Sequence, residues 1–196
     1  MIAAPPTPSK RASIPPATYR DGRPDPFSRE SMRNGIRHFI MTQGFTHSLT
    51  LNSNRDLSIP NIRGMFGNFC RRVDQDRFKK RHVERLPSCF RFRAIAFVEH
   101  AASYPHLHLA IDLGPTWLAS IVDDRLGRQL QAHWVEVTDG AGSIQLDPIT
   151  CIQGWSRYIT KNYRRDDEYF LSSDFHSDKS LIQSSKLRRV LEAIAA

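Results

Sequence analysis

Apolar and polar residues alternate in four segments of the chain. Successive side chains of a β-strand point to opposite faces of a sheet, so this alternation predicts strands that bury one face. The alternation is least regular in the fourth segment. The predicted strands are residues 45–51, 91–99, 106–111 and 131–139.

A second pattern, with apolar residues three or four positions apart, predicts helices between these strands. It is clearest after Pro60, where the inward positions would be Ile62, Phe66, Phe69 and Val73. Ser28 is a favourable N-cap for an earlier helix, and Gly127 suits the C′ position of a later one. The other predicted helices are residues 28–42, 116–127 and 147–165.

From residue 45 onwards these elements follow the order β-α-β-β-α-β-α. The expected fold class is therefore α+β, with a largely antiparallel central sheet covered by helices. Residues 1–27 are expected to form a disordered basic arm, because seven of the 12 prolines lie there. Residues 28–165 would form the folded domain, and residues 166–196 a polar tail with a helical pattern near its end.

The chain is strongly basic, with 28 Lys and Arg residues against 20 Asp and Glu residues and a net charge of +8. This balance favours a polyanionic partner such as nucleic acid, although a merely soluble basic protein explains it equally well. Basic residues gather in the second half of the long helix, where they would contact DNA phosphates or simply face solvent. These candidates are Arg71, Arg72, Arg77, Lys79, Lys80 and Arg81.

The three cysteines, Cys70, Cys89 and Cys151, are far apart in sequence and form no CxxC pair. Each is therefore expected to be buried and reduced, as in cytosolic proteins. No apolar run approaches the roughly 18 to 20 residues that span a bilayer, and the amino terminus carries no secretory pattern. We expect a cytoplasmic protein with no membrane partner.

The predicted hairpin "FRAIAFVEHAASYPHLHLAID" carries unusual polar residues for a core element. His106 and His108 are two positions apart and share a face, and Glu99 lies opposite His106 if the strands pair around the turn. Two imidazoles and one carboxylate with open positions suit a catalytic divalent cation. The alternative is a pair of buried histidines that simply hydrogen-bond to the backbone.

Tyr158 and Lys161 are three residues apart in the last predicted helix and would share one face. A tyrosine can attack phosphorus and form a phosphotyrosine ester, and a nearby ammonium group can neutralise the phosphate. Such a pair is common on amphipathic helices, so packing of Tyr158 against Trp155 is the alternative. Tyr163 lies five positions after Tyr158 and would face a different side.

Three quoted segments together are similar to the motifs of the HUH endonucleases, in particular single-tyrosine replication initiators of rolling-circle plasmids and small phages. They are "SLTLN" in the first strand, "HLH" with its upstream glutamate, and "YITK" on the last helix. The resemblance covers residues 45–165. It implies that Mg²⁺ or Mn²⁺ is held by His106, His108 and Glu99, with Tyr158 as the nucleophile and Lys161 as an accessory.

The resemblance also implies a reaction and its partners. The enzyme would nick and join single-stranded or locally melted DNA through a 5′-phosphotyrosine link. A host helicase would unwind the DNA, because no helicase segment follows the tyrosine. A transposase of the same superfamily is an alternative, although a glutamine is usual there in place of Lys161. A non-catalytic nucleic-acid-binding module is another, and it would expose aromatic residues such as Phe90, Phe92 and Phe97 for base stacking.

Overall fold

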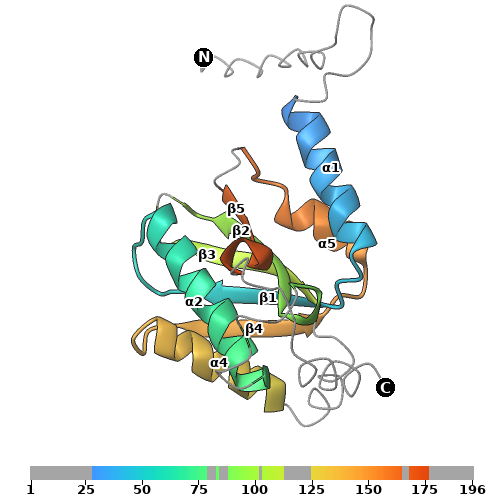
Figure 1. Cartoon of the computed structure of the whole chain (residues 1–196). Helices are drawn as coiled ribbons and strands as arrows, with labels where there is room; N and C mark the ends of the chain where they lie inside the picture. The colour runs from blue at the N-terminus through green and yellow to red at the C-terminus, as the bar shows by residue number, and fades with distance from the viewer. Residues whose placement is uncertain are drawn as a thin grey trace, which may run out of the picture.

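The computed structural model describes residues 28–78, 83, 88–101, 103–112, 125–164 and 168–176. Figure 1 shows a central sheet with helices packed against it. The first helix, α1 (Arg29–Thr42), begins where the sequence predicts, because the Ser28 hydroxyl accepts a hydrogen bond from the Ser31 backbone amide. The predicted arm, residues 1–27, lies outside the described residues.

The sheet has five antiparallel strands in the order β4-β1-β3-β2-β5. The α+β class is thus confirmed. The central strand β3 (His106–Asp112) pairs with β1 (His47–Asn52) on one side and with β2 (Arg93–Glu99) on the other. The edge strands are β4 (Ser143–Pro148) and β5 (Tyr169–Leu171).

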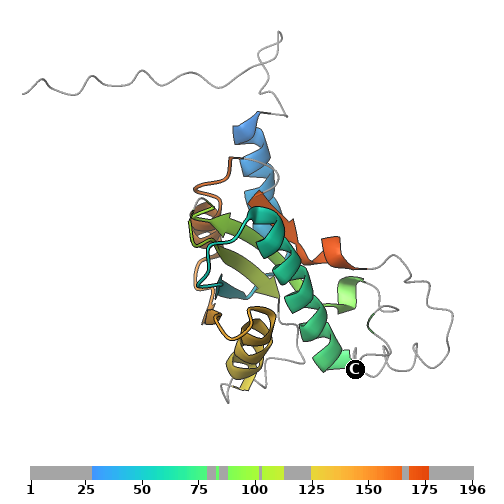
Figure 2. The ribbon, with the colours of Figure 1, turned by 90° about the vertical axis from the view of Figure 1, so that its left-hand side faces the viewer.

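Each face of the sheet packs against its own helices. Side chains along each strand point alternately to the two faces, and apolar residues occur on both of them. One face packs against α2 (Ile59–Phe78) and α4 (Arg125–Val137), which Figure 2 shows along one side of the sheet. The opposite face packs against α1 and α5 (Ile152–Ile159) through a second apolar cluster. The inward residues predicted for the long helix are all buried: Ile62, Phe66, Phe69 and Val73.

The prediction of a strand at 131–139 is wrong, because residues 131–137 belong to α4 and residues 138–139 to the turn that follows it. Leu126, Leu130 and Trp134 are four positions apart, and all three are buried on the helix side that faces the sheet. The indole of Trp134 also donates a hydrogen bond to the backbone oxygen of Asn52 at 2.7 Å. Gly127 accordingly lies inside α4 and not at a C′ position. Most of the helix predicted at 116–127 falls outside the described residues.

The structure also places two strands that the pattern did not predict. β4 occupies part of the segment expected to be a turn and the start of a helix, so α5 begins only at Ile152. β5 pairs with β2 inside the region expected to be a tail, and the 3₁₀ turn η4 (Ser172–Phe175) follows it. A second 3₁₀ turn, η2 (Ser88–Phe90), precedes β2. The helical pattern at 180–196 is outside the described residues.

The cysteine prediction holds for one residue of three. Cys70 is buried in α2, whereas Cys89 and Cys151 are exposed. Cys151 has a local role, because its sulfur accepts a hydrogen bond from the Gly154 amide and caps α5. Within the described part of the chain, no helix is both long and apolar enough to cross a membrane.

Candidate metal centre

The β2–β3 hairpin brings the three predicted metal ligands together. Its register pairs Glu99 with His106 and Phe97 with His108, as the period of two predicts. The Glu99 Oε2 atom lies 2.5 Å from His108 Nε2 and 3.3 Å from His106 Nε2. One donor atom from each of the three residues lies within 4.8 Å of the other two, so the group could hold a metal ion.

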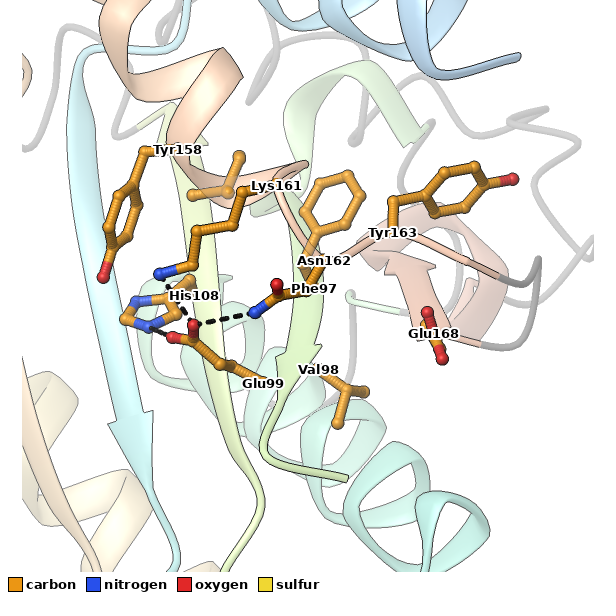
Figure 3. Close-up of a pocket in the computed structure, with 10 residues that line it drawn as sticks. Phe97, Val98, Glu99, His108, Tyr158, Lys161, Asn162, Tyr163 and Glu168 are labelled. Atoms are coloured by element: carbon orange, nitrogen blue, oxygen red, sulfur yellow. Dashed lines mark hydrogen bonds and ion pairs between the residues drawn. The ribbon is translucent and has the colours of Figure 1, made fainter. Parts of the chain in front are cut away.

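The Glu99 carboxylate has separate partners for its two oxygens, as Figure 3 shows. Oε2 faces the imidazoles, while Oε1 accepts hydrogen bonds from Lys161 Nζ at 2.7 Å and Asn162 Nδ2 at 3.1 Å. Burial raises the pKa of Glu99, but hydrogen bonds from Lys161 and His108 outweigh it and lower the pKa to about 2. The carboxylate is therefore ionised and held in one orientation near neutral pH.

His108 could bind a metal ion through Nε2, the ring atom that faces Glu99 Oε2. Burial lowers the pKa of His108, against the opposing effect of Glu99, so the imidazole is neutral near pH 7. Its Nδ1 lies 3.1 Å from the hydroxyl of Thr50, the residue opposite it on β1. When Nε2 is a ligand, Nδ1 carries the proton and donates to that hydroxyl, which fixes the ring orientation. Thr50 is a site residue that the sequence analysis missed.

Tyr158 projects from α5 next to this group. The centroid of its ring lies 5.3 Å from that of His108 and 5.2 Å from that of Trp155, on which it stacks. The Trp155 indole in turn donates a hydrogen bond to the Leu109 backbone oxygen at 3.2 Å. Trp155 thus anchors α5 to β3 and sets the position of Tyr158. The packing of Tyr158 on Trp155, proposed as an alternative to catalysis, is present together with the contact to His108. Tyr158 remains 41% exposed, so a substrate can reach it.

Lys161 lies in the turn after α5, because the helix ends at Ile159 and not near residue 165 as predicted. The turn still brings its ammonium group to 3.9 Å from the centroid of the Tyr158 ring. Hydrogen bonding to Glu99 raises the pKa of Lys161, so its charge is permanent near neutral pH. Tyr163 is only 4% exposed and points away from the carboxylate in Figure 3.

The DNA-binding residues predicted on α2 are separated from this site. Arg71, Arg72 and Arg77 lie on the helix that packs on the opposite face of the sheet. Arg72 forms an ion pair with Glu136 at 2.6 Å, and the Arg77 guanidinium lies over the Phe78 ring. Lys79, Lys80 and Arg81 fall outside the described residues. Contact of these six residues with DNA stays a prediction.

Other basic residues gather on the same side of the sheet as the candidate metal ligands. Arg37 donates to the Thr160 hydroxyl at 2.9 Å, and Arg33 donates to the Tyr163 backbone oxygen at 3.1 Å. Burial lowers the pKa of Arg37, and the positive charges of Arg33 and Arg157 lower it further. These residues were not predicted as site residues. The spacing of four positions between Arg33 and Arg37 could have indicated that they share one face of α1.

The donor set fits a divalent cation. Two imidazole nitrogens and one carboxylate oxygen leave open coordination positions, and three ligands on one side of an octahedral ion are about 3 Å apart. The same set also serves zinc hydrolases and non-haem iron enzymes. The ligands alone therefore do not identify the metal or the reaction.

The aromatic residues expected of a non-catalytic nucleic-acid module are largely unavailable for stacking on bases. Phe92 and Phe97 are 2% and 4% exposed, and Phe97 stacks on Tyr169 inside the core.

Comparisons of this chain with protein-family models, with curated proteins and with solved structures found no match.

Proposed function

We propose that this protein is a metal-dependent transesterase that nicks and joins single-stranded DNA through a covalent 5′-phosphotyrosine intermediate. We further propose that it acts as a rolling-circle replication initiator of the HUH type. The observation that carries this proposal is the placement of Tyr158 and Lys161 beside the three metal ligands. A zinc hydrolase or an iron oxygenase needs no exposed phenol at that position.

The residues of the chain divide the work in a way that suits phosphoryl transfer. His106, His108 and Glu99 would hold Mg²⁺ or Mn²⁺, which supplies Lewis-acid polarisation of the scissile phosphate. Lys161 stabilises the negative charge that forms on the Tyr158 oxygen, because its ammonium group lies against the ring. Asn162 and Lys161 keep Glu99 oriented through Oε1. Thr50 orients His108.

The proposed reaction exchanges one phosphate ester for another without oxidation or reduction. The Tyr158 oxygen forms a bond to phosphorus and loses its proton to water at the exposed edge of the ring. The bond from phosphorus to the 3′ oxygen of the DNA breaks, and that oxygen keeps the electron pair and takes a proton to become a 3′-hydroxyl. The 3′-hydroxyl can later attack the phosphotyrosine and reverse the step, which joins the strands.

Two features support single-stranded DNA as the substrate. The sheet face that carries the metal ligands continues over β1 and β4 with half-buried or exposed polar residues, among them Asn52 and Gln145. The three arginines Arg33, Arg37 and Arg157 would attract a phosphate backbone. The element order from β1 to α5 is compatible with the order expected of the HUH fold. Lys161 favours an initiator over a transposase.

The test is the capture of the covalent intermediate. The protein is incubated with Mn²⁺ and a pool of single-stranded oligonucleotides of random sequence, and adducts are separated by denaturing electrophoresis. We expect an adduct that requires Mn²⁺ and that Tyr158→Phe abolishes. Peptide mapping of the adduct should place the DNA on Tyr158.

Tyr163→Phe is the matched control, because it removes the hydroxyl of the neighbouring buried tyrosine. Adduct formation should survive this change. A wild-type protein that binds Mn²⁺ and single-stranded DNA but forms no adduct would refute the transesterase. An adduct that persists in Tyr158→Phe and maps to Tyr163 would show that the nucleophile is assigned wrongly.

A further inference from the structure

A pocket adjoins the three candidate metal ligands at the end of the sheet. It has a volume of about 430 Å³, within the range of small-ligand sites, and lies where β1 ends and the β2–β3 turn begins. His106 belongs both to this pocket and to the metal group, so the two sites share a wall. The lining residues relevant here are Asn52, Asn54, His100, Tyr104 and His106.

The backbone around this pocket is held in an uncommon conformation. Of the four non-glycine residues with positive φ in the described part of the chain, three line the pocket: Asn54 (53°), His100 (56°) and Tyr104 (48°). Asparagine adopts this region readily, whereas a tyrosine there is a genuine outlier. Such strain persists only where surrounding contacts enforce it, and it concentrates at binding sites.

Contacts between the two loops make the pocket preformed. The buried Ser53 hydroxyl lies within hydrogen-bond distance of the Pro105 oxygen, at 3.2 Å, and so joins the loop after β1 to the hairpin turn. Asn54 donates to the Ala141 backbone oxygen at 2.6 Å. Tyr104, by contrast, is 66% exposed although its ring is large and apolar. An exposed aromatic ring on a rigid polar pocket is the arrangement that stacks an unpaired base.

The pocket lies on the opposite side of the metal group from the nucleophile. Along β3, Trp155 contacts Leu109, the Tyr158 ring contacts His108, and the His106 ring follows at 4.9 Å from that of His108. The His100 ring comes next, 5.2 Å from that of His106, and Tyr104 is part of the turn beyond it. Tyr158 and the pocket are therefore at the two ends of the row of histidines.

We propose that this pocket binds the unpaired nucleotide whose 3′ oxygen leaves when Tyr158 attacks. The inference rests on the proposed function, because the entering and leaving oxygens in phosphoryl transfer lie roughly in line through phosphorus. With the phenol entering from the α5 side, the leaving oxygen and its nucleoside point toward His106 and the pocket. Tyr104 stacks on the base, and the polar residues around it determine which base is accepted.

The first experiment measures binding without chemistry. The affinity for a fluorescent mixed-sequence single-stranded oligonucleotide is measured by anisotropy in EDTA at low salt. Tyr104→Ala should weaken binding about 5- to 100-fold, the range for the loss of one stacked base. Tyr104→Phe keeps the ring and should bind like the wild type. Met41→Ala, an exposed apolar truncation on α1, is the matched control and should have no effect.

The second experiment identifies the nucleotide position. The released fragments from the Mn²⁺ reaction with random-sequence oligonucleotides are sequenced at their 3′ ends. The wild type should show a preference for the 3′-terminal base, and Tyr104→Ala should reduce that preference toward random. The base of the nucleotide that is joined to Tyr158 through its 5′ phosphate should be selected equally by both proteins.

The outcomes separate this inference from the proposed function. Unchanged affinity for Tyr104→Ala, with a normal melting temperature, would overturn the pocket even if the wild type forms adducts. Weakened binding without any wild-type adduct would keep a base pocket but overturn the transesterase and the leaving-side assignment with it. A changed base preference in the nucleotide that is joined to Tyr158 through its 5′ phosphate would overturn the leaving-side assignment alone.

Discussion

Replacement of Lys161 by methionine should have opposite effects on metal binding and on DNA nicking. The side chain keeps its length but loses the ammonium group that lies 2.7 Å from Glu99 Oε1. In the protein without metal this ammonium is the counter-ion of the carboxylate. A divalent cation at Oε2 adds two positive charges on the other side of the same carboxylate, and Lys161 repels them.

The magnitude follows from Coulomb's law. Two unit charges 4 Å apart interact by about 1 kcal/mol in water. A divalent cation doubles this figure, its greater distance from Nζ reduces it, and the 41% exposed Lys161 side chain is well screened. Relief of about 1 to 2 kcal/mol corresponds to roughly tenfold tighter Mn²⁺ binding. Protonation of Glu99 does not offset this gain at neutral pH, because even the ordinary pKa of 4.5 leaves it ionised.

Isothermal titration with Mn²⁺ at neutral pH and low salt measures this effect. The difference between Lys161→Met and the wild type should shrink as salt is added. Asn162→Ala is the matched control, because it removes an uncharged donor from the same oxygen, and it should bind Mn²⁺ no more tightly than the wild type. Adduct formation by Lys161→Met should fall by about 100- to 1,000-fold, the range for loss of one group that stabilises developing charge.

The result that refutes this reasoning is weaker Mn²⁺ binding by Lys161→Met. Lys161 would then act mainly by holding Glu99 in its ligating orientation, and the neutral donor Asn162 would be insufficient for that task. Equal loss of affinity in both variants would point the same way. Tighter metal binding with undiminished adduct formation would instead remove Lys161 from the chemical step.

Three further changes have expected outcomes. Thr50→Val removes the partner of a ligand imidazole and should weaken Mn²⁺ binding about 10- to 100-fold by titration, with little change in stability. Asp74→Asn leaves the buried Arg91 guanidinium without its counter-charge. It should lower the free energy of unfolding, measured with urea, by about 3 to 5 kcal/mol. The pKa of Glu99 falls from 4.5 to about 2 on folding, so its contribution to stability is complete above about pH 4.5 and lost as the pH falls toward 2. This contribution to the free energy of unfolding is about 3 kcal/mol at most, and it is smaller because Lys161 is exposed to solvent. In Glu99→Gln the free energy of unfolding should therefore fall less steeply as the pH is lowered.

The sequence was sufficient to place the candidate metal ligands because a strand has an exact period of two. His106, Leu107 and His108 alternate, and the short turn fixes which residue of β2 lies opposite each histidine. The Tyr158 ring also lies beside that of His108, with the two centroids 5.3 Å apart, while its role as a nucleophile stays a prediction. The contact between Thr50 and His108 could not be predicted from the sequence, because it depends on which strand pairs with the edge of β3 opposite to β2.

The segment around Trp134 shows why the remainder of the fold was harder to predict. Its alternation resembles a strand, and only the earlier Leu126 and Leu130 reveal the helical spacing. β4 is an edge strand with half-buried or exposed residues throughout, so it lacks the apolar alternation that marks the central strands. A longer window that includes Leu126 and Leu130 would thus have predicted the helix, whereas β4 depends on its pairing with β1.

The three-residue strand β5 has a protective consequence for the strand that carries Glu99. It supplies hydrogen-bond partners along the outer margin of β2, at Ile95 to Phe97, and Phe175 just beyond it packs so tightly on α2 that only a glycine fits at Gly67. A chain cut before Tyr169 would leave that margin bare and ready to recruit strands from other molecules. Self-association of such a shortened chain would thus be a sign of lost edge protection rather than of a damaged metal centre.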